Sequence, residues 1–104
     1  MNIEEIKAAV KKDEFILSFH AHEERQAELI SIDDIKTAFL NAEIIENYPG
    51  DKRVSSCLIL GYSNVRSIHI VCSKMKIGWL KIITVYIPKL PKWVTPKQRN
   101  KGGR

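Results

Sequence analysis

The run WLKIITVYI, at residues 79–87, is the strongest strand signal in the chain. Seven of its nine residues are β-branched or aromatic, and such side chains fit the pleated, half-buried surface of a sheet. Pro88 follows and ends the strand, because proline has no backbone N–H to donate to a neighbouring strand. The run therefore predicts a strand that begins near Trp79 and ends at Ile87.

Three runs upstream have the same character. They are IIENY at residues 44–48, CLILGY at 57–62 and VRSIHIVC at 65–72. Ser63 and Asn64 separate the last two and favour a hairpin turn between them. Together with residues 79–87, these runs predict an antiparallel sheet of about four strands in the C-terminal half.

The N-terminal part has helical patterns instead. Apolar residues recur at helical spacing in residues 3–11, and residues 20–28 form a polar block rich in helix formers. Ser31 with Asp34 three positions later matches a capping box, which predicts that a third helix begins there. The expected fold class is α+β, with the N-terminal helices packed on the C-terminal sheet.

The length of 104 residues is typical of one compact domain. We therefore expect a single α+β domain over residues 1–93. From Pro88 to the end there are three prolines, two terminal glycines and six cations, a composition that does not favour a packed core. Residues 94–104 are expected to form a flexible basic tail.

Charge is divided unevenly along the chain. All twelve Asp and Glu residues lie within residues 4–51, together with five of the seventeen Lys and Arg residues; the other twelve cations lie within residues 52–104. The first half thus carries −7 and the second +12. Such a field attracts polyanions, RNA first among them, or an acidic protein segment. A solvated basic surface without a partner is the alternative interpretation.

The sequence also indicates a compartment. No apolar run approaches the roughly 20 residues needed to cross a bilayer, and Glu4 and Glu5 make the N-terminus unlike a secretory signal. We expect a cytoplasmic protein with no membrane partner. Cys57 and Cys72 lie in apolar strand runs and form no C-x-x-C pair, so we expect buried, reduced thiols.

Candidate catalytic side chains occur in two places. On the predicted second helix, His20 and Glu24 are four positions apart and share a face, and Arg25 is three positions from His22. His69 lies on a strand, in the phase opposite to its apolar neighbours. Histidine, carboxylate and arginine are the groups that metal-independent RNA cleavage uses for proton transfer and for the charged phosphorane. Ordinary surface histidines and a satisfied cross-strand histidine are the alternatives.

Several short motifs between about Ser18 and Trp93 occur in a distinctive order. They are HAHEER at residues 20–25, IS at 30–31, ENYP at 46–49, SCLILG at 56–61, IHIVC at 68–72, IITVY at 82–86 and PKW at 91–93. In order and spacing the chain resembles an uncharacterised bacterial and archaeal family, domain of unknown function 4258. Val54-Ser55 stands where the family pattern has a Gly-Pro pair, so we expect a different loop shape at Arg53.

The resemblance implies a fold and a function. The family has been placed near the small toxin ribonucleases similar to RelE, and its members are often encoded beside a small antitoxin-like zinc-finger protein. What it implies here is a RelE/barnase-like fold and the RNA-cleaving toxin of a type II toxin–antitoxin system. The partners implied are RNA and a co-encoded antitoxin, and no cofactor is implied.

On this interpretation the candidate site residues fall into two groups. The catalytic candidates are His20, Glu24, Arg25 and His69. The candidates for binding RNA are Arg53, Arg66, Lys74 and Lys81, which would hold phosphate, and Tyr86 and Trp93, which would stack on a base.

Two other classes of function were weighed. A metal site would draw on His20, His22, His69, Cys57 and Cys72. We predict none, because an H-x-H pair splays on a helix and two lone cysteines lack the spacing of zinc ligands. A non-catalytic module that binds RNA or an acidic protein through the basic sheet is the serious rival. His20, Arg25 and His69 in one cleft would favour an enzyme, and dispersed histidines would favour the module.

Overall fold

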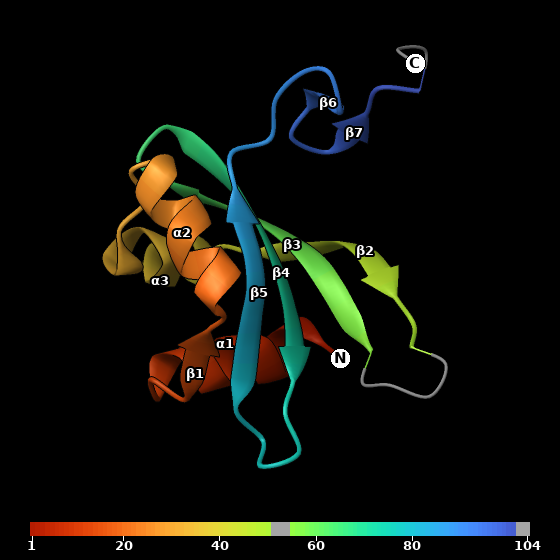
Figure 1. Ribbon diagram of the computed structural model, residues 1–104. Coiled ribbons are helices and arrows are strands. Elements are labelled where there is room, and N and C mark those ends of the chain that lie inside the picture. The colour runs from red at the N-terminus through yellow and green to blue at the C-terminus, as the bar shows by residue number, and fades with distance from the viewer. Residues whose placement is uncertain (51–54, 102–104) are drawn as a thin grey trace.

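The computed structural model describes residues 1–50 and 55–101 of the chain. Its elements, in chain order, are α1 (Ile3–Lys11), β1 (Phe15–Leu17), α2 (Phe19–Ala27), α3 (Ile32–Leu40), β2 (Glu43–Tyr48), β3 (Ser56–Ser63), β4 (Arg66–Lys74), β5 (Leu80–Tyr86), β6 (Trp93–Thr95) and β7 (Gln98–Arg99). The α+β class is confirmed. Figure 1 shows the three helices gathered on one side of a twisted sheet, with β6 and β7 beyond the end of β5.

The sheet has five strands in the order β1-β5-β4-β3-β2. Strands β2, β3, β4 and β5 pair with one another in antiparallel fashion, as the sequence predicts. The other neighbour of β5 is β1, which runs parallel to it and pairs Phe15 with Leu80. The sequence analysis did not predict β1 as part of the sheet. A run of three residues is too short for strand periodicity to show.

Each helix begins after a side chain that accepts a backbone N–H in its first turn. Asn2 accepts from Glu5 before α1, and Ser18 accepts from Ala21 before α2. Ser31 and Asp34 form the reciprocal capping box that the sequence predicts for α3. The first turn of α3 is also joined to the sheet, because Asp34 accepts a hydrogen bond of 2.7 Å from the hydroxyl of Ser63 on β3.

The core lies between the helices and one face of the sheet. The sheet contributes buried residues that alternate along β3, β4 and β5, namely Cys57, Ile59, Ile68, Ile70, Cys72, Ile82 and Val85. Ile35 and Phe39 of α3 pack against them and are fully buried. Cys57 and Cys72 are buried free thiols, as predicted, with their sulfur atoms 4.0 Å apart. Each large side chain buried here stabilises the fold by about 1.5–3 kcal/mol.

Helix α3 approaches strand β3 closely at Gly61. A Cβ atom at this position would lie 2.0 Å from the backbone oxygen of Ala38 in α3. Only glycine leaves room for the helix backbone at that distance.

The C-terminal segment contains a short element. β6 and β7 form a two-stranded hairpin with Trp93 paired to Arg99, and the flexibility expected of residues 94–104 stays a prediction. We call residues 93–99 the β6–β7 hairpin. Within the described residues, no helix is long and apolar enough to cross a membrane.

Candidate functional site

The face of the sheet opposite the helices carries a polar cluster. In β4, Ile68 and Ile70 face the helices, so His69 faces the other way. His69 pairs across the sheet with Leu60 on β3 and Tyr86 on β5. Glu46 on β2 pairs with Leu58, whose neighbours along β3 face the helices, so Glu46 shares the helix-free face with His69.

His69 is fully buried and both of its ring nitrogens have partners. Its Nε2 atom lies 2.7 Å from the backbone oxygen of Pro96, and its Nδ1 atom lies 3.1 Å from the hydroxyl of Tyr86. A carbonyl oxygen only accepts, so Nε2 carries the hydrogen. In the neutral ring, Nδ1 therefore accepts the hydrogen of the Tyr86 hydroxyl.

The β6–β7 hairpin covers this cluster. The Trp93 ring packs edge-on against His69 with 4.4 Å between ring centroids, and the Arg99 guanidinium lies 4.6 Å from the Trp93 ring centroid. Arg99 also donates to both carboxylate oxygens of Glu46, at 2.7 and 2.8 Å, and the Tyr48 hydroxyl donates to the same carboxylate. The aromatic contact and the bidentate ion pair thus hold the hairpin to the sheet, together with the Pro96–His69 hydrogen bond and an ion pair between Lys97 and Glu43.

These contacts shift the proton affinities of the cluster. The Arg99 hydrogen bonds lower the pKa of Glu46 to about 2. Burial lowers the pKa of His69 and raises the pKa of Tyr86. The indole of Trp93 lies near enough to the Tyr86 hydroxyl to oppose that rise, yet its Nε1–H makes no hydrogen bond of good geometry within the described structure. At neutral pH, burial therefore favours a neutral His69 beside a protonated Tyr86.

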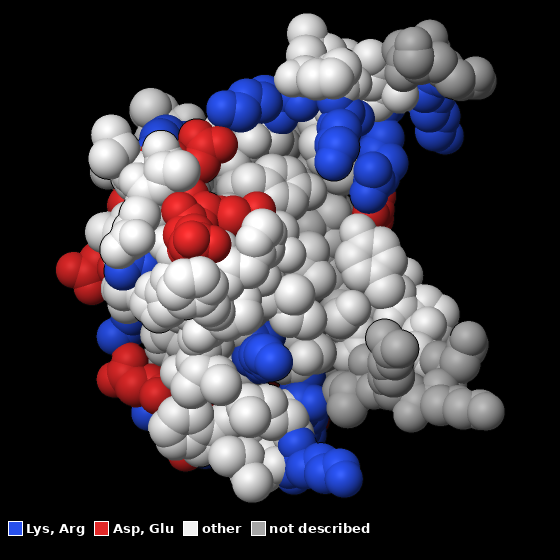
Figure 2. Space-filling view, in the orientation of Figure 1, with Lys and Arg blue, Asp and Glu red and all other residues white. Residues whose placement is uncertain are grey.

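Part of the basic half of the chain is paired with the acidic half. Five ion pairs join cations of residues 66–99 to carboxylates of residues 5–46; they are Arg66–Asp34, Lys74–Glu5, Lys89–Glu28, Lys97–Glu43 and Arg99–Glu46. Figure 2 shows positive side chains gathered around the β6–β7 end and negative ones over α2. The separation of charge along the sequence is therefore partly cancelled by folding.

Two of the residues predicted on α2, His20 and Glu24, lie near the edge of β5. Strand β1 covers only the first part of that edge, and Glu24 covers the rest by accepting the backbone N–H of Val85 at 3.0 Å. His20 lies 3.3 Å from the other carboxylate oxygen of Glu24 and is largely exposed. Glu24 is close enough to raise the pKa of Tyr86, so this pair adjoins the His69 cluster without a direct contact to it among the described interactions.

Arg25 serves a different part of the molecule. Its Nε donates to Nδ1 of His22 at 3.2 Å, and its Nη1 donates to the backbone oxygen of Ile30 at 3.3 Å. These contacts tie α2 to the segment that leads into α3. They do not bring Arg25 to His69.

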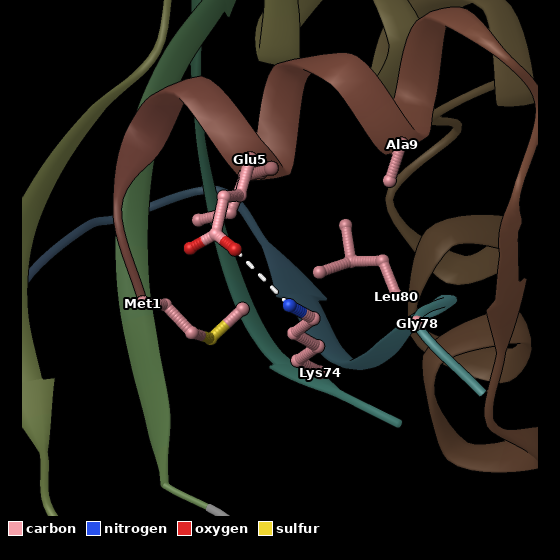
Figure 3. Close-up of a pocket in the computed structure, with 7 residues that line it drawn as sticks. Met1, Glu5, Ala9, Lys74, Gly78 and Leu80 are labelled. Carbon is pink, nitrogen blue, oxygen red and sulfur yellow. Dashed lines mark hydrogen bonds and ion pairs between the residues drawn. The ribbon is translucent and has the colours of Figure 1, made fainter. Parts of the chain in front are cut away.

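The cations predicted to hold phosphate are spread over the fold. Arg66 donates to the backbone oxygens of Glu28 and Leu29 and to Asp34, which joins the start of β4 to the helices. Lys74 lies at the opposite end of the sheet, where it pairs with Glu5 at 3.0 Å beside a small apolar pocket (Figure 3).

The two remaining predicted cations are Lys81 and Arg53. Lys81 pairs with Ser73 on β4, in the phase of His69 but four residues along that strand, or about 13 Å away. Arg53 lies outside the described residues.

Of the two predicted aromatic residues, both adjoin His69. Tyr86 is half-buried, whereas Trp93 is 3% exposed and has His69 and Arg99 against its ring. Trp93 therefore has no free face for a base while the hairpin is in place.

Sequence reasoning missed Glu46, Tyr48 and Arg99. Glu46 and Tyr48 belong to the ENYP motif, where their spacing of two residues places them on one face of a strand. That signal was available. Nothing in the sequence indicated Arg99, because its place depends on the hairpin folding back over the sheet.

Among the described residues, no three His, Cys, Asp or Glu side chains gather as metal ligands would. His20 and His22 lie on α2, His69 lies on the helix-free face, and Cys57 and Cys72 lie in the core on the other face. The five residues that could have formed a metal site thus occupy three different places.

Comparison with known proteins gives one match. The sequence model described as Domain of unknown function (DUF4258) matches residues 17–87, which span α2 to the end of β5. No curated protein and no solved structure matches the chain.

Proposed function

We propose that this chain, which belongs to the DUF4258 family, is a metal-independent endoribonuclease that cleaves RNA at the helix-free face of its sheet. One observation carries the proposal. A buried histidine with a tyrosine hydroxyl on one ring nitrogen lies next to an arginine–carboxylate pair, under a basic hairpin. A base, an acid and a phosphate-binding cation are the three groups that this reaction needs.

The two shifted pKa values favour definite roles. A His69 kept neutral by burial can act as the base, and a Tyr86 kept protonated can act as the acid. Nε2 of His69 would take the proton of the 2′-hydroxyl while the 2′-oxygen bonds to phosphorus. As the bond from phosphorus to the 5′-oxygen breaks, Tyr86 would give that oxygen its proton and regain one from Nδ1 of His69. Arg99 would stabilise the phosphorane charge.

This chemistry requires the turn of the β6–β7 hairpin, at Pro96, to move away from His69. Pro96 blocks the Nε2 atom of His69 and holds the hydrogen on it, which is the wrong tautomer for a base. An RNA phosphate could replace Glu46 as the partner of Arg99, since both present two oxygens to a planar guanidinium. The closed structure would then be the resting state, and the substrate would favour opening.

The wider role follows from the resemblance described above. We propose that the chain is the toxin of a type II toxin–antitoxin system in the cytoplasm, and that a co-encoded antitoxin, of zinc-finger type, blocks it. A partner that keeps the hairpin closed would inhibit as well as one that fills the site. Co-purification of a neighbouring gene product from the native operon would support this proposal. Unhindered growth during expression of the chain alone would count against it.

A non-catalytic binding module is the second candidate, and a specific observation favours it. His69 is fully buried with both nitrogens satisfied, as in a histidine that serves only packing. On this account the cations without an ion pair in the described structure, such as Lys76, Lys81 and Lys92, would hold RNA or an acidic protein.

The deciding experiment is incubation of the purified chain with RNA in the presence of EDTA. An endoribonuclease of this kind leaves 2′,3′-cyclic phosphate ends, and a single 2′-deoxy substitution at the cut site abolishes cleavage. Binding without cleavage favours the module if it occurs both in the wild type and in Glu46→Gln, which removes the carboxylate that holds Arg99 and should loosen the hairpin. Cleavage that EDTA stops contradicts the metal-independent mechanism.

A further inference from the structure

A pocket opens where the chain leaves β5 for the β6–β7 hairpin. Its volume is about 240 Å³, and its lining residues are Glu28, Tyr86, Ile87, Lys89, Leu90, Pro91, Lys92 and Trp93. A cavity of about 150 Å³ takes a benzene ring, so this space, which is partly open to solvent, can take a planar ring system.

The pocket adjoins the candidate catalytic cluster through shared residues. Tyr86 lines it and bonds to His69 through its hydroxyl, and Trp93 lines it and packs against the same histidine. A ligand in this pocket would therefore lie one side chain away from His69.

The walls combine aromatic and apolar surface with a charged pair. Tyr86, Ile87 and Pro91 supply the apolar part. At the rim, Lys89 Nζ lies 3.3 Å from Glu28 Oε1, which places a donor and an acceptor side by side.

We propose that this pocket binds one nucleobase of the RNA next to the scissile phosphate. The ligand class rests on the proposed function, because only RNA brings a base to this position. A base presents a flat apolar face together with adjacent donors and acceptors on its edge, which matches the walls and the Glu28–Lys89 pair. Because Glu28 is paired with Lys89, the rim offers an acceptor beside a donor, which suits the edge of a base better than a series of carboxylates.

The test measures binding of single nucleotides, which needs no cleavage. Trp79 and Trp93 are the two tryptophans, so Trp79→Phe leaves Trp93 as the sole indole reporter. In this background we expect each nucleoside monophosphate to change Trp93 fluorescence saturably, with purines binding more tightly because they bury more ring surface. Ribose 5-phosphate, which lacks a base, is the matched probe and should bind at least tenfold more weakly.

Two variants locate the binding. Glu28→Gln keeps the shape but removes the charge, and should weaken nucleotide binding roughly tenfold, the scale of a hydrogen bond to a charged group. Lys11→Ala, at the exposed end of α1, is the control and should bind as the parent does. Thermal unfolding of both variants checks that the fold is intact.

The outcomes separate this inference from the proposed function. Nucleotide binding that Glu28→Gln weakens supports the pocket even if the chain cleaves no RNA. Cleavage of RNA with no nucleotide binding, or equal binding of ribose 5-phosphate, overturns the pocket and leaves the endoribonuclease standing. An acidic peptide that binds more tightly than the nucleotides, and whose binding changes in Glu28→Gln, also overturns the inference.

Discussion

The guanidinium of Arg99 holds the carboxylate of Glu46 with two hydrogen bonds of 2.7 and 2.8 Å, although 53 residues separate them in the chain. This pair joins the β6–β7 hairpin to β2, across the face on which His69 is buried. Arg99 also lies over the Trp93 ring, so one side chain contacts both the Glu46 carboxylate and the aromatic ring that packs on His69. The state of the hairpin therefore depends strongly on Arg99.

We expect Arg99→Ala to open the hairpin. The variant loses the bidentate pair and the contact with Trp93, so the indole becomes accessible to acrylamide in a Trp79→Phe background. Arg99→Lys should have an intermediate effect, because lysine keeps the charge but not the planar fork. Lys101→Ala, outside the hairpin, is the control. Unchanged quenching of Trp93 in Arg99→Ala would show that the ion pair does not hold the β6–β7 hairpin against the sheet.

The pH dependence of stability should report on His69. Its pKa is lowered in the folded state, so below about pH 6.5 the unfolded chain binds a proton that the folded chain does not. The free energy of unfolding should therefore decrease as the pH falls from about 7.5 to 5, until His69 is protonated in the folded state. Urea titrations of the wild type and His69→Gln measure this. An equal decrease in both proteins would contradict the assignment.

Glu46 should act in a lower pH range. Its pKa is lowered from 4.5 to about 2, so its contribution to stability is present above about pH 4.5 and is lost as the pH falls through about 2. In Glu46→Gln this loss should be absent and the hairpin should be loosened at neutral pH as well. Hydrogen exchange at the amide of Asn100, which donates to Lys92 at 2.8 Å, follows the hairpin. Slow exchange in the variant at neutral pH would refute the prediction.

The approach of α3 to β3 gives a stability test that does not depend on function. Gly61→Ala places a methyl group against the backbone of Ala38 and should cost about 2 kcal/mol or more. Gly78→Ala is the matched control, because Gly78 has open space around it and only its positive φ of 93° opposes a side chain. That change should cost about 1 kcal/mol. Urea midpoints in the reverse order would mean that the helix can move away from Gly61.

Mutation of the two candidate histidine positions should separate the sequence interpretation from the structural one. If the chain cleaves RNA at the helix-free face, His69→Ala and Tyr86→Phe should lower the rate roughly a hundredfold or more. His20→Ala should have a small effect, because His20 is exposed and pairs with a carboxylate that accepts from β5. Circular dichroism of each variant separates lost chemistry from lost folding. A large loss in His20→Ala with full activity in His69→Ala would return the site to α2.

Arg25→Lys completes that comparison. Arg25 contacts His22 and the backbone of Ile30, so the substitution should lower thermal stability and leave catalysis by the folded protein nearly unchanged. A tenfold loss of rate at full stability would place Arg25 on the phosphate, as the sequence analysis expected.

Local sequence patterns determined most of the secondary structure. Alternation along residues 65–72 places Ile68 and Ile70 in the core and His69 on the other face, because strand side chains point to opposite faces in turn. The capping box of Ser31 and Asp34 predicts the start of α3, because its hydrogen bonds lie within one turn of helix. These features depend on neighbours a few residues away, and a sequence shows such neighbours directly.

Only the tertiary structure decided which side chains meet. Glu24 and Arg25 are adjacent in sequence, yet one completes the edge of β5 and the other ties α2 to Ile30, because adjacent residues on a helix point about 100° apart. Arg99 reaches Glu46 because a hairpin of seven residues folds back over the sheet. Its position depends on contacts between residues far apart in the chain, and no local pattern encodes them. The sequence alone therefore indicated the helices, strands β2 to β5 and the face of His69, while packing chose the partners of His69, added β1 and closed the hairpin over the histidine.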